Sequence, residues 1–125
     1  MNVIDSSGWI EYFVNGPNAN FFAPSIEDRE NLIVPTVCLY EVFKRVLSEF
    51  DEDRALETVG EMLTGTVVEL DRNIAIQAAQ TSIKFKLAMA DSIIIATAYT
   101  YEATLWTQDQ HFKTLEGVKY IRKKD

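Results

Sequence analysis

The sequence predicts an α/β fold, in which a short, mostly parallel sheet of four to five strands is covered by helices on both faces. Short apolar runs alternate along the chain with longer segments whose apolar residues recur every three to four positions, a pattern typical of strands joined by helices. The chain has 125 residues, which fit one domain, and 47% of them are hydrophobic, enough for a sizeable core.

The first apolar run, residues 2–4, predicts a buried strand that ends at Asp5. Ser6 and Ser7 follow directly. Because serine side chains accept hydrogen bonds from free backbone N–H groups, these two residues can cap a helix over residues 8–14. The chain is therefore expected to open with a strand and a helix.

A turn signal, NGPN, separates this unit from a second helix, predicted over residues 19–30, and a strand over residues 31–34. A long helix is predicted over residues 37–50, because its apolar residues recur at a spacing of three to four. Its expected core face consists of Val42, Phe43, Val46, Leu47 and Phe50. Residues 51–63 predict a further helix with an acidic surface.

The second half continues the alternation. A third strand is predicted over residues 66–70, and Asp71 can cap a helix over residues 72–86. Residues 90–101 are apolar on nearly every side, so we expect a helix that is buried from several directions. The last two strands are predicted at residues 103–106 and 118–121, the second of them at an edge of the sheet.

The net charge of −7 argues against a general attraction to nucleic acids or membranes through bulk charge. The charges are unevenly spread, however. Residues 49–61 hold six acids and one base, whereas the segment from Lys113 to Lys124 holds five bases and one acid. We interpret each block as a solvated face or a frayed end, and neither alone implies a partner.

Cys38 is the only cysteine, so no internal disulfide can form, and we interpret it as a small buried residue. The N-terminal segment lacks the basic flank and long apolar run of a signal peptide, and no segment approaches the ~20 apolar residues of a membrane span. The sequence predicts a cytoplasmic protein without membrane contact.

Four acids are placed to meet at the carboxyl ends of the strands, where open α/β sheets bind their ligands. Asp5 follows the first strand, Asp109 follows the fourth, and Asp91 opens the apolar helix that leads into the fourth. Glu41 lies less than two turns into the helix after the second strand. Taken singly, each has a structural explanation as a cap, a first-turn acid, a solvated helix residue or a turn residue. Their conjunction favours one shared site.

Four neighbouring carboxylates would raise one another's pKa unless a positive charge lay among them. A hard divalent cation, Mg²⁺ or Mn²⁺, suits this need because it prefers oxygen ligands. The His/Cys set of a zinc site is absent, and we interpret His111, the only histidine, as a loop or surface residue. Such a cation activates water and neutralises phosphate, so the sequence predicts phosphodiester hydrolysis despite the acidic net charge.

Four segments then become recognisable: NVIDSSGWIEYF, VPTVCLYEVFKRVL, KLAMADSIIIATA and LWTQDQHFKTLEGVKYI. In this order they resemble the signature segments of PIN-domain ribonucleases, and within these the VapC-type toxins of bacterial and archaeal toxin–antitoxin pairs. The resemblance spans essentially the whole chain and implies one PIN domain over residues 1–125. It also implies metal-dependent endonucleolytic cleavage of structured RNA, such as tRNA or rRNA, that leaves a 5′-phosphate.

The resemblance also implies the site residues. The acids expected to hold the metal and to act in catalysis are, in chain order, Asp5, Glu41, Asp91 and Asp109. Ser6 stands in the small hydroxyl position beside the first of them, and Thr107 is expected to hydrogen-bond a carboxylate or a water from behind. Many relatives carry proline where Ala88 stands and a further acid where His111 stands. The second departure leaves open whether the site holds one metal ion or two.

Partners follow from the same resemblance. It implies an RNA substrate, a homodimer, and a cognate VapB-type antitoxin whose extended segment covers a groove and whose Arg or Lys can enter the acidic site. Candidate contacts to RNA phosphates, each with solvated surface as the alternative, are Lys44, Arg45, Lys84 and Lys86. Aromatic side chains that line either the groove or the core are Trp9, Tyr12, Phe13, Phe21 and Phe22.

Other functions fit less well. An aspartyl-phosphate enzyme with Asp5 as its nucleophile would need an acid two residues later, where Ser7 stands. A receiver domain would need an acidic pair and a late lysine in positions that this chain does not provide. The alternative that stays open is a catalytically inactive PIN fold that binds RNA or protein.

Overall fold

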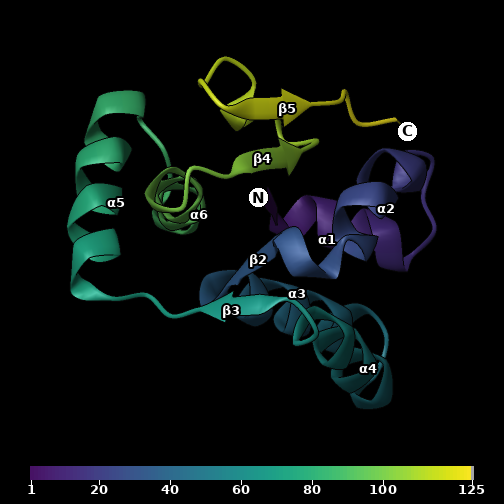
Figure 1. The fold of residues 1–125 in the computed structure, drawn as a ribbon. Helices are drawn as coiled ribbons and strands as arrows, with labels where there is room; N and C mark the ends of the chain where they lie inside the picture. The colour runs from purple at the N-terminus through teal and green to yellow at the C-terminus, as the bar shows by residue number, and fades with distance from the viewer. Residues whose placement is uncertain (125) are drawn as a thin grey trace.

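The strands form one five-stranded, entirely parallel sheet in the order β3–β2–β1–β4–β5, as the computed structural model shows for residues 1–124, the part of the chain that it describes (Figure 1). The strands are β1 (Asn2–Ile4), β2 (Leu32–Pro35), β3 (Thr66–Val68), β4 (Thr104–Thr107) and β5 (Val118–Tyr120). The predicted α/β fold is therefore confirmed, and β5 is the predicted edge strand.

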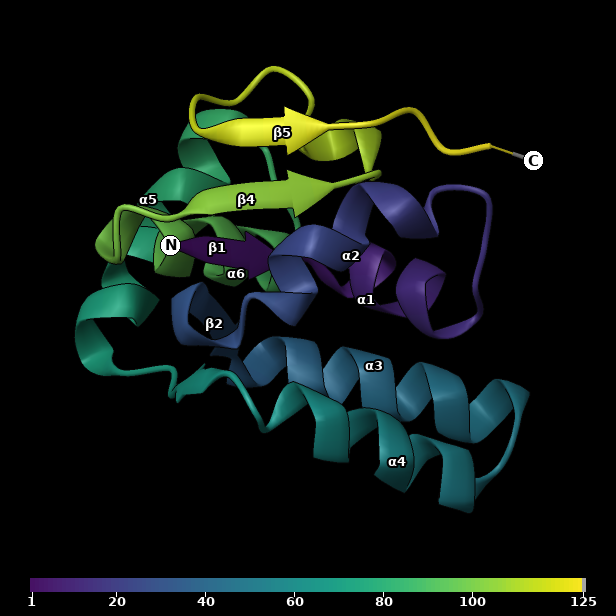
Figure 2. The same cartoon turned by 45° about the vertical axis from the view of Figure 1, so that its right-hand side comes forward.

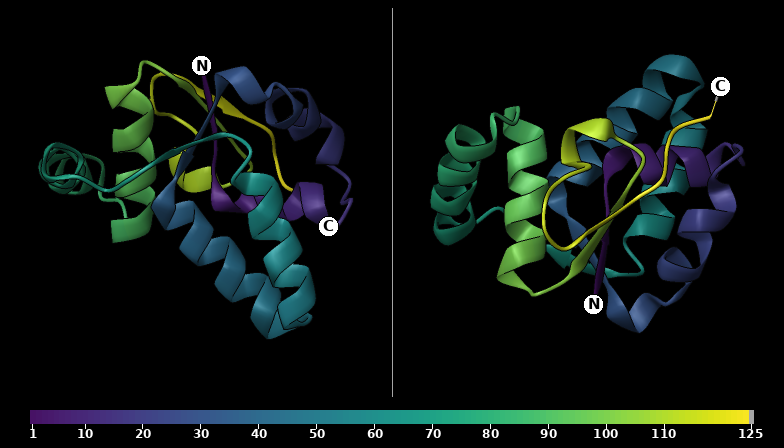
Figure 3. Two further views of the ribbon diagram at one scale, coloured as in Figure 1. Left: turned by 60° about the horizontal axis from the view of Figure 1, so that its bottom comes forward. Right: turned by 90° about the horizontal axis from the view of Figure 1, so that it is seen from above.

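Helices lie on both faces of this sheet. They are α1 (Ser6–Phe13), α2 (Ala19–Glu27), α3 (Thr36–Glu49), α4 (Glu52–Met62), α5 (Arg72–Phe85) and α6 (Met89–Thr100), with short 3₁₀ turns η1 (Arg29–Asn31) and η2 (Gln110–Phe112). One face carries α6, which packs on β1, β2 and β4, with α5 outside it, and the other carries α1 and α2 (Figures 1 and 3). Helix α3 packs against β2 and runs side by side with α4 (Figure 2).

The centre of the core lies between β1 and α6. Val3 and Ile4 of β1 are fully buried, and every residue of α6 from Ser92 to Ala98 is buried. The helix predicted to be buried from several directions is thus confirmed. Cys38 is also fully buried, as expected. Within residues 1–124, no helix combines the length and the apolar character that a membrane crossing requires.

The predicted core face of α3 is only partly correct. Val42 and Val46 are buried and Phe43 packs against the core, but Leu47 and Phe50 are 44% and 46% exposed. The end of α3 extends beyond the sheet, where α4 is its main neighbour (Figure 2). Apolar spacing therefore identified the helix correctly but not how far along it the core reaches.

The aromatic residues of α1 and α2 divide between the core and its margin. Trp9 and Phe22 are fully buried, whereas Tyr12, Phe13 and Phe21 are partly buried and pack against the core. Two of the five therefore belong to the core alone.

The cap of α1 also differs from the prediction. Helix α1 begins at Ser6, so Ser6 and Ser7 are its first two residues, and the N-cap is Asp5, whose Oδ1 accepts a hydrogen bond of 2.9 Å from the Gly8 backbone N–H. A carboxylate caps a helix as well as a serine hydroxyl does, and here it also interacts favourably with the helix dipole.

Gly8 provides a test of how tightly α1 packs. A Cβ at Gly8 would lie 2.7 Å from both Ile4 Cγ2 and Phe22 Cε1, so Gly8→Ala overpacks the core and should lower the free energy of unfolding by about 1–3 kcal/mol. Gly60 in α4 has no atom within 4 Å of its would-be Cβ, so Gly60→Ala should instead raise stability by about 0.5–1 kcal/mol. Urea unfolding measures both variants, and a stable Gly8→Ala protein would contradict this packing.

Candidate active site

The site begins where β1 and β4 end side by side. These strands pair in parallel with Ile4 opposite Trp106, and the Asp5 N–H donates to the Trp106 carbonyl at 3.1 Å. The Thr107 hydroxyl donates to Asp5 Oδ2 at 2.6 Å and accepts from the Asp109 N–H at 2.9 Å. One hydroxyl therefore links the acid that follows β1 to the acid that follows β4.

Asp5 is the most enclosed of the four predicted acids, with 3% of its surface exposed. Besides the bonds from Thr107 and Gly8, the Ser7 hydroxyl lies 2.8 and 2.9 Å from its two oxygens. Burial raises the pKa of Asp5 to about 7, against the lowering effect of these three donors, and the charge of Asp109 raises it slightly further. The sequence did not single out Ser7 as a partner of this carboxylate.

Asp91 reaches the site from the first turn of α6. The N-cap of this helix is Ala88, so Asp91 is the third helical residue, where an acid complements the helix dipole. Burial raises the pKa of Asp91 to about 6, and the charges of Asp109 and Glu41 add to the effect, whereas His111 opposes it. Acids from two other elements therefore act on the charge of Asp91.

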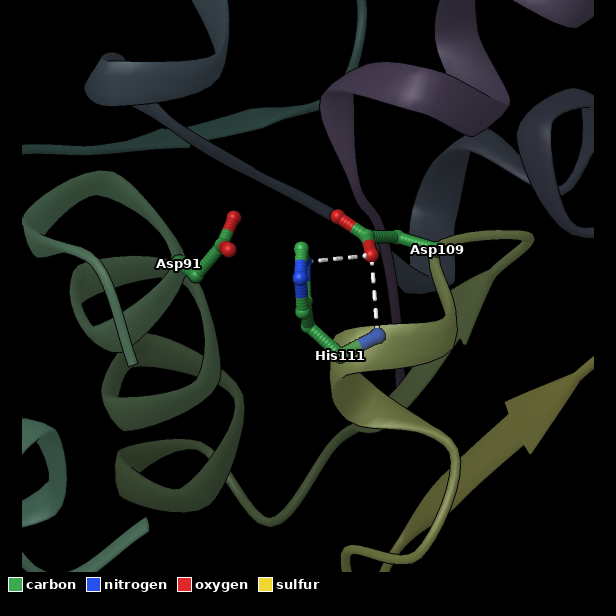
Figure 4. Close-up of side chains that lie close together, drawn as sticks. All are labelled: Asp91, Asp109 and His111. Atoms are coloured by element: carbon green, nitrogen blue, oxygen red, sulfur yellow. Dashed lines mark hydrogen bonds and ion pairs between the residues drawn. The ribbon is translucent and has the colours of Figure 1, made fainter. Parts of the chain in front are cut away.

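Three side chains lie close enough together to share one metal ion (Figure 4). Asp91, Asp109 and His111 each offer one ligand atom, and these atoms all lie within 4.8 Å of one another. His111 Nδ1 is 2.9 Å from Asp109 Oδ1. His111 is exposed on η2, as expected of a surface residue, but its place in this group was missed. Its only signal in the sequence was its position two residues after Asp109.

Glu41 joins the site from α3 through a hydrogen bond of 2.7 Å from the Ser6 hydroxyl to its Oε1. One turn earlier on α3, the thiol of Cys38 is fully buried, with its Sγ 3.8 Å from the Ile4 carbonyl oxygen. Burial raises its pKa, and the charges of Asp5, Glu41 and Asp91 add to this effect. Asp5 and Glu41 lie outside the group of Asp91, Asp109 and His111, and the role of all four acids as metal ligands stays a prediction.

No lysine or arginine within residues 1–124 forms an ion pair with any of the four acids. The ion pairs there join Arg45 to Glu49, Arg54 to Asp51, and His111 to Asp109. A partly buried set of carboxylates without a basic partner suits a bound divalent cation, because oxygen ligands are those that Mg²⁺ and Mn²⁺ prefer. The donor set therefore fits the predicted metal.

Two hollows meet at Ser7. One, of about 340 Å³, includes Glu41 together with two of the predicted RNA contacts, Lys44 and Arg45. The other, of about 640 Å³, includes Asp109.

The remaining predicted RNA contacts lie elsewhere. Lys84 lines a different hollow that includes none of the four acids, and its Nζ lies 5.2 Å from the ring centre of Phe85. Lys86 is the exposed left-handed residue that ends α5. The structure thus brings two of the four predicted bases to a hollow at the acid site and does not do so for Lys84.

The raised pKa of Asp5 has a consequence for stability without metal. Its folded value of about 7 lies above the ordinary value of 3.8, so its contribution to stability is full below pH ~3.8 and is lost as the pH rises to about 7. Asp5→Asn keeps the shape and cannot ionise. In EDTA, we expect its melting temperature to exceed that of the native chain at pH 8 and this advantage to shrink at pH 5.

The matched control is Glu69→Gln, which neutralises an exposed acid just after β3. Its melting temperature should follow that of the native chain at both pH values. An Asp5→Asn advantage of equal size at pH 5 and pH 8 would show that ionisation of Asp5 does not cause it.

Comparisons with known proteins agree with this architecture. No curated protein matches the chain. Among solved structures, a toxin–antitoxin complex from Klebsiella pneumoniae has a chain with a TM-score of 0.79 and 21% identity, covering 95% of this chain and 96% of that one. VapC20 of Mycobacterium tuberculosis, described as a sarcin–ricin-loop-cleaving toxin, has a TM-score of 0.78 and 10% identity, covering 93% of this chain and 95% of its own. A chain of DNA-bound VapBC from Salmonella typhimurium has a TM-score of 0.75 and 17% identity, covering 97% of this chain and 96% of that one.

At these identities the similar structures establish the fold alone. The family follows from the sequence match, because residues 3–118 match the PIN domain. That range includes both linked strand ends, β1 and β4, and all four acids. The chain therefore belongs to the PIN domain family.

Proposed function

We propose that this chain is a divalent-metal-dependent endoribonuclease, a VapC-type toxin that a cognate antitoxin neutralises. One observation supports the proposal above all: the acids lie near the linked ends of β1 and β4 without a lysine or arginine partner in residues 1–124. Asp5 and Asp109 share the Thr107 hydroxyl, Asp91 has a carboxylate oxygen close to Asp109, and Glu41 accepts a hydrogen bond from Ser6. The shared fold with toxins of solved toxin–antitoxin complexes supports it. The acids alone would suit several phosphate-transfer reactions, and membership of the PIN family favours the nuclease.

Asp91 and Asp109, with His111 beside them, would hold the cation, and Asp5 and Glu41 complete the anionic surround. A bound Mg²⁺ or Mn²⁺ supplies Lewis-acid polarisation of the phosphate and activation of water. Whether the chain holds one ion or two stays open, because His111 replaces an acid that many relatives carry.

The protein's own groups fix the geometry. Three donors, from Thr107, Ser7 and Gly8, hold both oxygens of Asp5, so the carboxylate cannot rotate freely. With a pKa of about 7, Asp5 can keep a proton on its carboxyl near neutral pH when no cation is present. Losing this proton makes the carboxylate available as a ligand, so metal affinity should rise with pH up to about 7.

The partners follow the same logic. An anionic pocket attracts Arg or Lys side chains, so a basic segment of an antitoxin can occupy it in place of the metal. The proposed substrate is structured RNA of the tRNA or rRNA class. VapC20, which is described as cleaving the sarcin–ricin loop, is one structurally similar protein with such a target. Homodimer formation stays a prediction.

The first prediction concerns cleavage of a total small-RNA pool by the purified chain without antitoxin. We expect discrete fragments in Mg²⁺ or Mn²⁺ and none in excess EDTA. Asp5→Asn and Asp91→Asn should each reduce the rate by roughly a hundredfold or more, because each removes a charge that holds or faces the cation. Gel electrophoresis of end-labelled RNA measures the rate.

The control is Glu69→Gln, which should cleave as the native chain does. Calorimetry of Mn²⁺ binding separates the remaining outcomes. A folded chain that binds Mn²⁺ without cleaving the pool would point to a narrow substrate missing from it. A folded chain that neither binds metal nor cleaves RNA would favour the inactive binding module.

A second prediction concerns the hydroxyl that links Asp5 and Asp109. Thr107→Val keeps the shape but removes both hydrogen bonds of the hydroxyl, so cleavage should fall by roughly 10–100-fold while the fold persists. Thr104→Val, at the other end of β4, should have no such effect. Equal rates for the two variants, with unchanged circular dichroism, would contradict the role of Thr107.

A further inference from the structure

A polar groove of about 640 Å³ leads away from the acid site. It includes Ser7 and Asp109 and is otherwise lined by residues in and beside η2 and by the end of β5 with the segment that follows it. Three bases belong to its lining: Lys113, Arg122 and Lys123. The chain has a net charge of −7, but the charge in this groove is mostly positive, directly beside the anionic site.

The three bases are available to a ligand. All are exposed, and within residues 1–124 none forms an ion pair with an acid. Lys113 Nζ lies 5.7 Å from the ring centre of Tyr120, which also lines the groove. A cation over an aromatic ring is held loosely in place and keeps N–H groups for an anion.

A buried network holds this segment against the site. Asn18 Nδ2 donates to the Arg122 carbonyl and to Gln108 Oε1, each at 3.0 Å, and the Ile121 N–H donates to the Thr107 carbonyl at 3.0 Å. The backbone that carries Arg122 and Lys123 is therefore tied to the end of β4, just before Asp109.

Asn18 is itself fixed. Its backbone N–H donates to Glu11 Oε2 at 2.7 Å, and Glu11, Asn18 and Gln108 are all buried. The loop before α2 closes directly on this carboxylate, because a Cβ at Gly16 would lie 2.5 Å from Glu11 Oε1. A network of this kind positions a surface segment in one place.

We propose that Lys113, Arg122 and Lys123 form a phosphate-binding rim, which holds the backbone of the RNA strand beside the acid site. The inference rests on the proposed nuclease function and adds where the strand lies. The hollow with Lys44 and Arg45 also includes Ser7, so each of the two hollows that share this residue has bases in its lining. An acidic protein segment is the alternative occupant, and the test below distinguishes it from RNA.

The test measures binding without cleavage, in the Asp91→Asn chain. The probe is bulk tRNA labelled with fluorescein, followed by fluorescence anisotropy from low to high salt. The logarithm of the association constant falls as the logarithm of the salt concentration rises. Replacing all three rim bases by glutamine should make this negative slope shallower by roughly 2–3, since each phosphate contact contributes about 0.7–0.9. Affinity should fall roughly a hundredfold at ~0.1 M salt.

The control makes the same change of charge elsewhere, with Arg54→Gln, Arg72→Gln and Lys119→Gln combined. Arg54 lines a separate hollow with α1, α3 and α4, Arg72 begins α5, and Lys119 lies over the Trp106 ring. Its salt slope should change much less than that of the rim variant. An equal change in both would show that only net charge matters, which overturns the rim.

The outcomes separate the two proposals. Cleavage by the native chain together with an unchanged slope in the rim variant overturns the rim and leaves the nuclease intact. If the rim variant instead loses binding of a fluorescent polyglutamate peptide but keeps tRNA affinity, the groove belongs to an acidic protein segment. A folded native chain that binds no tRNA and cleaves no RNA overturns both.

Discussion

The hydrogen bond from the Thr107 hydroxyl to Asp5 is the interaction on which the site depends. It exists because β1 and β4 are parallel neighbours, so that their carboxyl ends open at the same edge of the sheet. The same hydroxyl accepts a hydrogen bond from the Asp109 backbone N–H and so fixes the position of the Asp109 backbone. A shift of one residue in the β1–β4 register would turn Thr107 to the opposite face and separate these groups.

Burial makes this arrangement costly without a cation. Asp5 is enclosed by β1, β4 and α1, and the fully buried Cys38 thiol lies close enough for the charge of Asp5 to raise its pKa. The raised pKa values of Asp5 and Asp91 reflect this cost of burying a charge, since each carboxylate ionises more easily in water than in the folded protein. A positive charge placed among these carboxylates would offset this cost, which suits both the proposed metal ion and the proposed antitoxin.

Much of the fold could be predicted from the sequence, because an alternation of strands and helices is compatible with few arrangements of a parallel sheet. The order of strands could not, since periodicity says nothing about which strands pair. Leu47 and Phe50 were misplaced because spacing locates a helix face without showing where its neighbours end. The closeness of His111 to Asp91 was missed for a different reason. The 3₁₀ turn η2 places the His111 side chain there, and no pattern in the sequence predicts this turn.

The two ends of the described chain differ in their relation to the site. Met1 is held at the amino end of the sheet, where its carbonyl accepts from the Thr104 N–H, and the carboxyl ends of the parallel strands lie at the opposite edge. Arg122 and Lys123, by contrast, line the groove at the acids. An affinity tag or surface tether attached before Met1 would therefore leave the acid site open, whereas one attached after the basic segment would crowd the entrance that nucleic acid is proposed to use.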